Sequence, residues 1–472
     1  MSNLKTTSDS SRYMSIIKSA LRGDEYDLTS INLRKAVVLL AIPMVLELAL
    51  ESVFAVVDIF FVNKLGTHAT SVVGLTESVI TIVYSVGIGL SAAATAMVAR
   101  RVGEKDIEGA SHAGAQAILL ALAASVVIGI PGFVFADRIL NLMGAEPEAI
   151  KMGTNYARIM LTCNAPIILL FLINGIFRGA GNASIAMKSL WIGNIFNIIL
   201  DPLLIFGFAF IPAFGVEGAA IATTTGRTIG VLYQLYHLWR SSGLLHIKAR
   251  HFKPDLSVIR GIIGIASPAT FQFIIASASW IFLASMVAEY GSAASAGYQT
   301  AIRLIVFFIL PAWGMSNAAA TLVGQNLGAQ LPERAEESVK ITARYNVIFM
   351  TAVTLIFLFF ARPLVSFFIP AGETEQIRYA VLALQIISSG YIFYGISMVV
   401  TQAFNGAGDT TTPTWVYFFG FWLFQIPFAW LLHRYSGIGV KGVFWAVPIA
   451  ETLMAIAVFF LFRTGKWKVV KV

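Results

Sequence analysis

Long apolar runs alternate with short polar segments along the whole chain. A helix that crosses a bilayer needs about 20 mostly apolar residues, and twelve runs meet this requirement. They lie near residues 36–62, 72–99, 114–136, 156–177, 188–211, 217–239, 258–288, 297–323, 343–369, 379–403, 414–433 and 440–462. The pattern predicts an all-α integral membrane protein with twelve transmembrane helices.

Composition supports a membrane protein. The 472 residues are 57% hydrophobic and 12% charged, whereas soluble domains carry about 25% charged residues. The net charge of +8 comes from Lys and Arg residues between the apolar runs, where they face lipid phosphates. We therefore expect a lipid bilayer as partner and no nucleic acid. The single cysteine, Cys163, cannot form a disulfide within the chain.

Basic residues are distributed unevenly between the two sides of the predicted bundle. With the N-terminus inside, the inner segments hold 22 Lys and Arg residues, Arg100 and Arg178 among them, and the outer loops hold 7. Cytoplasmic loops carry the excess of positive charge, which places both termini in the cytoplasm and the chain in the plasma membrane. The predicted divisions are an N-terminal tail (1–32), a first lobe (33–240), a cytoplasmic linker (241–257), a second lobe (258–463) and a C-terminal tail (464–472).

The two halves of the sequence repeat each other. At a shift of 225 residues, Gly89 aligns with Gly314 and Gly103 with Gly328, and FRGAGN (177–182) later aligns with FNGAGD (404–409). Six spans separate the copies, so both enter the membrane from the same side. We expect two six-helix lobes related by a pseudo-two-fold axis along the membrane normal, around a cavity that opens alternately to either side.

Acidic residues inside the predicted spans are concentrated in the first half. A charge at a helix centre costs about 2.5–3.5 kcal/mol on insertion scales, so each one needs a reason. The repeat provides an internal control, because the second half builds the same helices with neutral residues. The aligned pairs are Glu47 with Gln272, Glu51 with Ala276, Asp58 with Leu283, and Asp201 with Phe428.

Helical geometry groups these acids. At 100° per residue, Glu47, Glu51 and Asp58 lie on one face of the first span. Asn194, Asn197 and Asp201 likewise share one face of the fifth span. Carboxylate and amide oxygens are ligands for a proton or a hard cation.

The grouping predicts a coupling-ion site. It contains Asp58, Asp201, Asn197 and Asn194, with neutral oxygens added by Asn174 and Thr223. Na⁺ would bind at Asp58, Asn197 and Asp201. We expect Glu47, Glu51 and Gln272 to line a substrate cavity, where the two carboxylates would attract cationic solutes.

Other polar residues in the spans are weaker signals. Arg227 aligns with Glu451 in the repeat, and we expect both to be structural. The six histidines lie near predicted helix ends or in loops, so we expect neither an enzyme nor a cofactor. No nucleotide-binding motif is present, so the energy for transport would come from an ion gradient.

Several motifs together resemble the multidrug and toxic compound extrusion family over about residues 30–462. They are AIPM (41–44), VDIFFVNKLG (57–66), FRGAGN (177–182), NIILDPLLIFG (197–207), GVEGAAIAT (215–223) and LVGQNLGA (322–329). The resemblance implies two six-helix lobes around a V-shaped cavity and antiport of cationic or aromatic drugs and toxic metabolites against H⁺ or Na⁺.

The resemblance also implies particular roles. It places the cation site in the first lobe, at Asp58, Asn197, Asp201 and Thr223, and makes Pro43 the hinge of the first helix. The branch of the family with acids in helices seven and ten is disfavoured, because those helices lack acids here. We expect a monomer. The alternative is a flippase for lipids or lipid-linked oligosaccharides, whose central cavity often carries many arginines.

Overall fold

The computed structural model describes residues 9–208, 212–240, 243–370 and 372–472, without the side chains of residues 9–13 and 54–59. The first half of the chain forms eight helices, α1 (Asp9–Arg22), α2 (Leu33–Asn63), α3 (Thr67–Gly103), α4 (Ile107–Leu142), α5 (Pro147–Thr162), α6 (Ala165–Ala180), α7 (Ala183–Phe206) and α8 (Val216–Trp239). A short 3-10 helix, η1 (Ala249–Phe252), lies in the connection to the second half.

The second half repeats the long helices of the first. Its elements are α9 (Leu256–Ala288), α10 (Ser292–Gly328), α11 (Pro332–Phe368), α12 (Thr374–Ser388), α13 (Tyr391–Ala407), α14 (Thr411–Tyr417), the π-helix η2 (Phe418–Gln425), α15 (Ile426–Tyr435), α16 (Val440–Arg463) and the 3-10 helix η3 (Lys466–Val469). α14, η2 and α15 follow one another without a gap and make one span.

The helices account for the twelve predicted spans. Among the described residues, ten segments are long and apolar enough to cross a membrane, and the pair α12–α13, bent by 56°, makes an eleventh. The remaining predicted span is α8, which packs beside α7 and is more polar, with Arg227 and three consecutive threonines. One predicted span, 156–177, is broken: α5 ends at Thr162 and α6 begins at Ala165.

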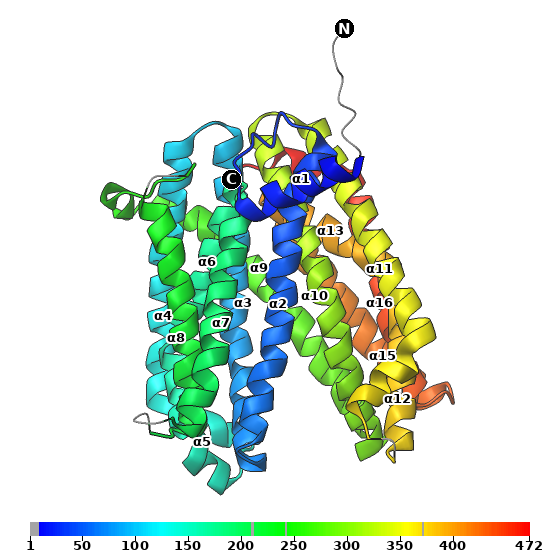
Figure 1. The fold of residues 1–472 in the computed structure, drawn as a ribbon. Coiled ribbons are helices and arrows are strands. Elements are labelled where there is room, and N and C mark those ends of the chain that lie inside the picture. Colours follow the sequence, from blue (N-terminus) through cyan, green and yellow to red (C-terminus); the bar gives the residue numbers. More distant parts are fainter. Residues whose placement is uncertain (1–8, 209–211, 241–242, 371) are drawn as a thin grey trace.

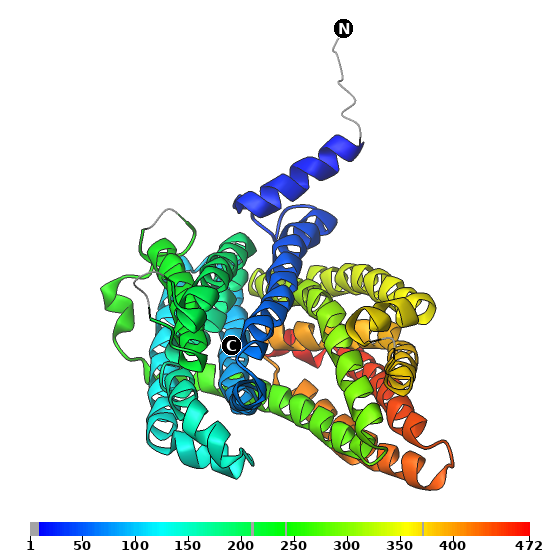
Figure 2. The same cartoon turned by 60° about the horizontal axis from the view of Figure 1, so that its bottom comes forward.

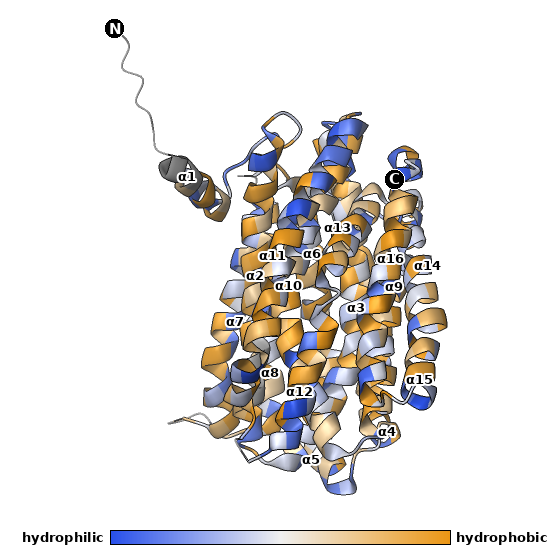
Figure 3. Cartoon of the chain, turned by 90° about the vertical axis from the view of Figure 1, so that its right-hand side faces the viewer, coloured by the Kyte–Doolittle hydropathy of each residue, from blue (hydrophilic) through white to orange (hydrophobic). Residues whose placement is uncertain are grey.

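The helices form two bundles that meet at one end of the molecule. In Figure 1, α1 and the C-terminus lie at this end, which we call the terminus end, and the bundles diverge toward the far end. Figure 2 shows the two groups from nearer the far end. Hydrophobic residues cover the middle of the bundles in Figure 3, as on a surface that faces lipid.

Four glycines bring the helix backbones of the two lobes into close contact. At the terminus end, a Cβ added to Gly103 would lie 2.0 Å from the carbonyl oxygen of Gln325, and one added to Gly328 would lie 2.1 Å from that of Arg100. About 21 Å further along the same helices, a Cβ on Gly89 would lie 2.6 Å from a backbone oxygen of α9, and one on Gly314 would lie 2.4 Å from a backbone oxygen of α2. These are the glycine pairs aligned by the repeat, so the helix crossings follow the pseudo-two-fold axis. Only glycine allows backbones to approach this closely.

The C-terminal segment connects both lobes at the same end. Trp467 is fully buried and its ring stacks on Phe462 with centroids 4.8 Å apart. Lys468 forms an ion pair with Glu336 of α11 at 2.6 Å. Arg100 of α3 donates a hydrogen bond to the carbonyl of Val470 at 2.5 Å. The segment therefore belongs to the folded core of the terminus end.

Candidate functional site

A cavity of about 340 Å³ lies between the two lobes. α2, α3 and α6 line one side, and α9, α10 and α13 line the other. The cavity lies on the far side of the glycine crossing, by which we mean the helix contact at Gly103 and Gly328. Ala320 lines the cavity, whereas Gly324, one turn closer to the terminus end, packs on Ala99. Six aromatic side chains face it: Phe171, Phe273, Trp280, Trp313, Tyr394 and Tyr417. Such a surface suits flat organic molecules.

The charge of this cavity differs from the expectation. Of the three residues predicted to line it, Gln272 does so, but Glu47 and Glu51 are not among its lining residues. The charged side chain among the described lining residues is Arg178. The two glutamates lie behind the cavity wall, each held by an arginine.

Glu47 is the centre of a buried polar network. Arg178 Nη1 lies 3.1 Å from Glu47 Oε1, and Asn174 Nδ2 donates to the same oxygen at 2.9 Å. Arg178 also donates to Ser91 Oγ at 2.8 Å. Gln234 of α8 donates to Asn174 Oδ1 at 2.5 Å. α2, α3, α6 and α8 thus share one hydrogen-bonded network, in which the charge of Glu47 is neutralised.

Arg178 lies in a different environment from the inner loop that the pattern of basic residues predicts. It lies within α6, in the last turn, and is 9% exposed. Arg100, predicted in the same way, lies within α3 and is also 9% exposed. The signal that could have revealed Arg178 is an arginine four residues after Asn174, on the same helix face.

Glu51 belongs to a second ion pair. Arg227 Nη2 lies 3.3 Å from Glu51 Oε1 and 3.0 Å from the hydroxyl of Tyr84. Asn194 Nδ2 donates to Glu51 Oε2 at 3.3 Å. Asn194 was predicted to share a site with Asp201, and the structure places it beside Glu51. A buried guanidinium keeps its charge, and each of these two glutamates lies beside one.

The predicted ion-site residues Asn197, Asp201 and Thr223 come together between α7 and α8. Asn197 Nδ2 lies 3.4 Å from Asp201 Oδ1 and 3.1 Å from Thr223 Oγ1. Asp201 is fully buried, Asn197 is 2% exposed and Thr223 is 8% exposed. Asn197 Oδ1 has no hydrogen-bond partner in the described part of the chain. The group offers a carboxylate and neutral oxygens in a dry environment, which suits a proton or Na⁺.

Three other predicted site residues lie elsewhere or outside the description. Asn174 joins Glu47 and is not in hydrogen-bonding contact with Asp201. Asp58 lies within α2, but its side chain is outside the described residues. Pro43 lies inside α2, next to Met44, whose carbonyl faces Gly314 of α10. A proline here removes one helical hydrogen bond at the contact between the lobes.

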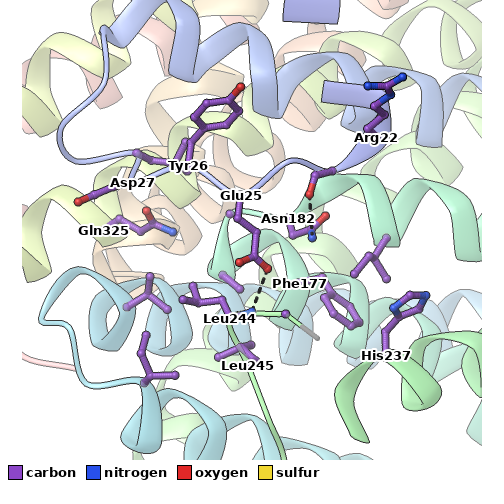
Figure 4. A pocket seen from close by; sticks show the side chains of 18 of the residues that line it. Arg22, Glu25, Tyr26, Asp27, Phe177, Asn182, His237, Leu244, Leu245 and Gln325 are labelled. Carbon is purple, nitrogen blue, oxygen red and sulfur yellow. Dashed lines mark hydrogen bonds between the residues drawn. The ribbon is translucent and has the colours of Figure 1, made fainter. Parts of the chain in front are cut away.

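A second cavity, of about 470 Å³, lies at the terminus end of the first lobe. The segment before α2 covers it: Glu25 accepts a hydrogen bond from Leu244 N at 2.9 Å, and Asn182 donates to Gly23 O (Figure 4). Nearby, Lys105 Nζ lies 2.8 Å from Asp27 Oδ2 and lowers the pKa of that carboxyl. The N-terminal segment is thereby fixed to the loop after α3.

Comparisons with known proteins give a consistent result. The MatE family model matches residues 43–203 and 268–431, which are the two halves of the repeat. The chain is 26% identical to the "Probable multidrug resistance protein NorM" of Thermotoga maritima, covering 93% of this chain and 94% of that one. It is also 26% identical to the "FAD transporter" of Shewanella oneidensis, covering 93% and 96%.

A solved structure has the same fold over nearly the whole chain. It is described as the outward-facing conformation of a multidrug resistance MATE family transporter of the MOP superfamily. Its TM-score is 0.87 at 26% identity, with 93% of this chain and 96% of that chain covered.

Proposed function

The chain is a member of the MatE family, and we propose on that premise that it exports organic solutes in exchange for H⁺ or Na⁺ by alternating access. One observation carries the proposal. A fully buried carboxylate, Asp201, lies among neutral oxygens in the lobe that forms half of an aromatic cavity. A group that is costly to charge in the bilayer, in a lobe that also lines a solute cavity, is suited to exchanging an ion.

The acids of the first lobe divide into two kinds. Glu47 and Glu51 each face an arginine, and a proton added to either would leave that arginine buried without its counter-charge. Asp201 accepts a hydrogen bond from the amide of Asn197, and the same amide donates to the hydroxyl of Thr223. We assign ion coupling to Asp201 with Asn197 and Thr223, because a buried carboxylate here adjoins a buried amide oxygen, Asn197 Oδ1, that has no hydrogen-bond partner among the described residues. We retain Asp58 as the predicted second carboxylate.

The cavity favours aromatic cargo. Phe273 and Trp313 present stacked rings, with centroids 6.2 Å apart, and Arg178 is the charge at the wall. Aromatic faces bind flat molecules and attract organic cations without a carboxylate at the surface. The flippase alternative requires many arginines in this cavity, and Arg178, already neutralised by Glu47, does not support it.

Orientation and site of action complete the proposal. The excess of Lys and Arg at the terminus end supports cytoplasmic termini in the plasma membrane. The structure would then be closed toward the cytoplasm, and solutes would leave the cavity at the far end.

Reconstituted vesicles provide the test. Wild-type protein should move ethidium against its gradient when a proton or sodium gradient is imposed, and comparing the two gradients identifies the ion. Asp201→Asn and Asp58→Asn should each abolish this movement at normal protein levels. Asp137→Asn, an exposed acid on α4, is the matched control. Full coupled transport by both Asp201→Asn and Asp58→Asn would refute the assignment of the ion site.

A further inference from the structure

The second lobe also contains a buried acid. Glu451 lies in the middle of α16 and is 7% exposed. Arginines neutralise Glu47 and Glu51 in the first lobe, but no salt bridge in the described part of the chain includes Glu451. A carboxylate buried without a cation is most cheaply neutralised by binding a proton.

The repeat shows why no cation accompanies this acid. Glu451 occupies the position of Arg227 in the first lobe. Arg227 pairs with Glu51, but the residue aligned with Glu51 is Ala276, which cannot form an ion pair. The second lobe has therefore replaced a neutral ion pair by a single acid, which helix packing does not require.

Three tyrosines lie on helices that pack against α16, the helix that carries this acid. Tyr391 and Tyr394 are in the first turn of α13, and Tyr417 is the last residue of α14. Tyr394 and Tyr417 also line the cavity. Tyr391 is 3% exposed, and its hydroxyl has no hydrogen-bond partner among the described residues. Two of these tyrosines thus connect the cavity wall with the helix that carries Glu451.

Two irregular helices enclose the same acid. A Cβ on Gly390, at the bend between α12 and α13, would lie 2.7 Å from Pro448 Cβ. One on Gly420, within the π-helix η2, would lie 2.2 Å from Met454 Sδ. Pro448 and Met454 are one turn before and one turn after Glu451. π-helical turns are rare and recur at functional sites, and Tyr417 directly precedes this one.

Among the residues that the structure describes, the other charged groups on elements packed against α16 lie away from Glu451. The helices packed against α16 carry their charged or titratable residues near helix ends. On α15, His433 lies opposite Gly442, nine residues from Glu451, or about 13 Å along the helix. The remaining groups on neighbouring elements are Glu375, Arg378 and Tyr379 of α12, Arg434 and Tyr435 of α15, Arg260 of α9, and Lys466 and Lys468 of η3, with Lys441 and Arg463 at the ends of α16.

We propose that Glu451, Tyr394 and Tyr417 form a proton-binding site in the second lobe that exchanges its proton for an organic cation in the central cavity. This inference rests on the proposed export function and deepens it by naming the cargo. With the cavity empty, the carboxyl of Glu451 holds a proton. A flat cation that binds against Tyr394 and Tyr417 stabilises the carboxylate, the O–H bond breaks, and the proton leaves to water. A neutral solute releases no proton.

Proton release on dye binding tests the proposal without transport. Ethidium is added to purified protein in weakly buffered detergent solution that contains a pH indicator, and fluorescence reports the bound dye. Wild-type protein should release up to one proton from this site for each dye bound, and Glu451→Gln should lose that release. Glu451→Asp should restore it in part. Asp137→Asn, at an exposed position near the C-terminal end of α4, should behave as wild type.

The outcomes separate this proposal from the export function. Unchanged proton release by Glu451→Gln overturns the second-lobe site, even if cells export the dye. Release that depends on Glu451, in a protein that does not move ethidium in vesicles, overturns the export function alone. If Glu451→Gln does not fold, Tyr394→Phe and Tyr417→Phe replace it. They remove the phenolic hydroxyls of the proposed site and should shift the pH at which release is half complete, and an unshifted pH in both contradicts the site.

Discussion

A methyl group added to Gly103 should force the lobes apart at the terminus end. The new Cβ would lie 2.0 Å from the carbonyl oxygen of Gln325, whereas favourable contacts between non-bonded atoms are about 3.5 Å or longer. The opposing atom belongs to the backbone of α10 and cannot rotate away. Overpacking of this kind typically costs about 1–3 kcal/mol. If only the present conformation bears this cost, the equilibrium shifts toward a state open at this end by about 5- to 150-fold.

Distances between spin labels would measure this shift. The labels are attached to Glu104→Cys and Glu333→Cys, two exposed positions at the terminus end, after the exposed Cys163 is replaced by serine. Gly103→Ala should add a longer distance to the distribution. Gly74→Ala is the control, because it lies on the same helix and a Cβ there meets nothing within 4 Å. A folded Gly103→Ala protein with the wild-type distribution would show that the crossing does not hold the lobes together.

Three further predictions concern stability. Glu47→Ala leaves Arg178 buried without a carboxylate and should cost about 3–5 kcal/mol, whereas Glu47→Gln keeps an oxygen acceptor and should cost less; equal losses of thermal stability would contradict the ion pair. Trp467→Ala should cost about 3–5 kcal/mol because the ring is fully buried, and unchanged thermal unfolding would contradict a folded C-terminal segment. The lowered pKa of Asp27 means that its pair with Lys105 stabilises the protein above the ordinary value of 3.8 and loses that effect as pH falls below it. Acid titration of thermal stability should show this step, and Asp27→Asn should lack it.

Sequence periodicity identified the helices but not their interruptions. The α5–α6 break falls in an apolar run and coincides with Pro166 in the first turn of α6. There the buried Asn164 also donates to the carbonyls of Leu161 and Ser125 at 2.7 and 3.1 Å. The π-helix at Phe418–Gln425 has no sequence signal, because a wider turn needs no special residue. The twelve-helix fold could therefore be predicted from apolar length, which does not show the breaks.

The ion-site group was predictable in part because it is local. Asn197 and Asp201 are four residues apart on one helix, so geometry alone places them together. The arginine partners of Glu47 and Glu51 were not predictable, since Arg178 and Arg227 are 131 and 176 residues away in the chain. The sequence could show that charge is concentrated in the first lobe, but not which acids already have a counter-charge.

The glycine crossing has a consequence for how this transporter can change its cargo. The barrier at the terminus end includes backbone contacts at Gly103 and Gly328 and a hydrogen bond between the lobes from Gln325 to the carbonyl of Gly179. The side chains that we propose to meet the solute lie on the walls of the aromatic cavity, away from these contacts. Mutation can therefore enlarge, shrink or recharge the cavity without making the membrane leaky. A single scaffold of this design can diversify toward many compounds while each variant still prevents passive flow.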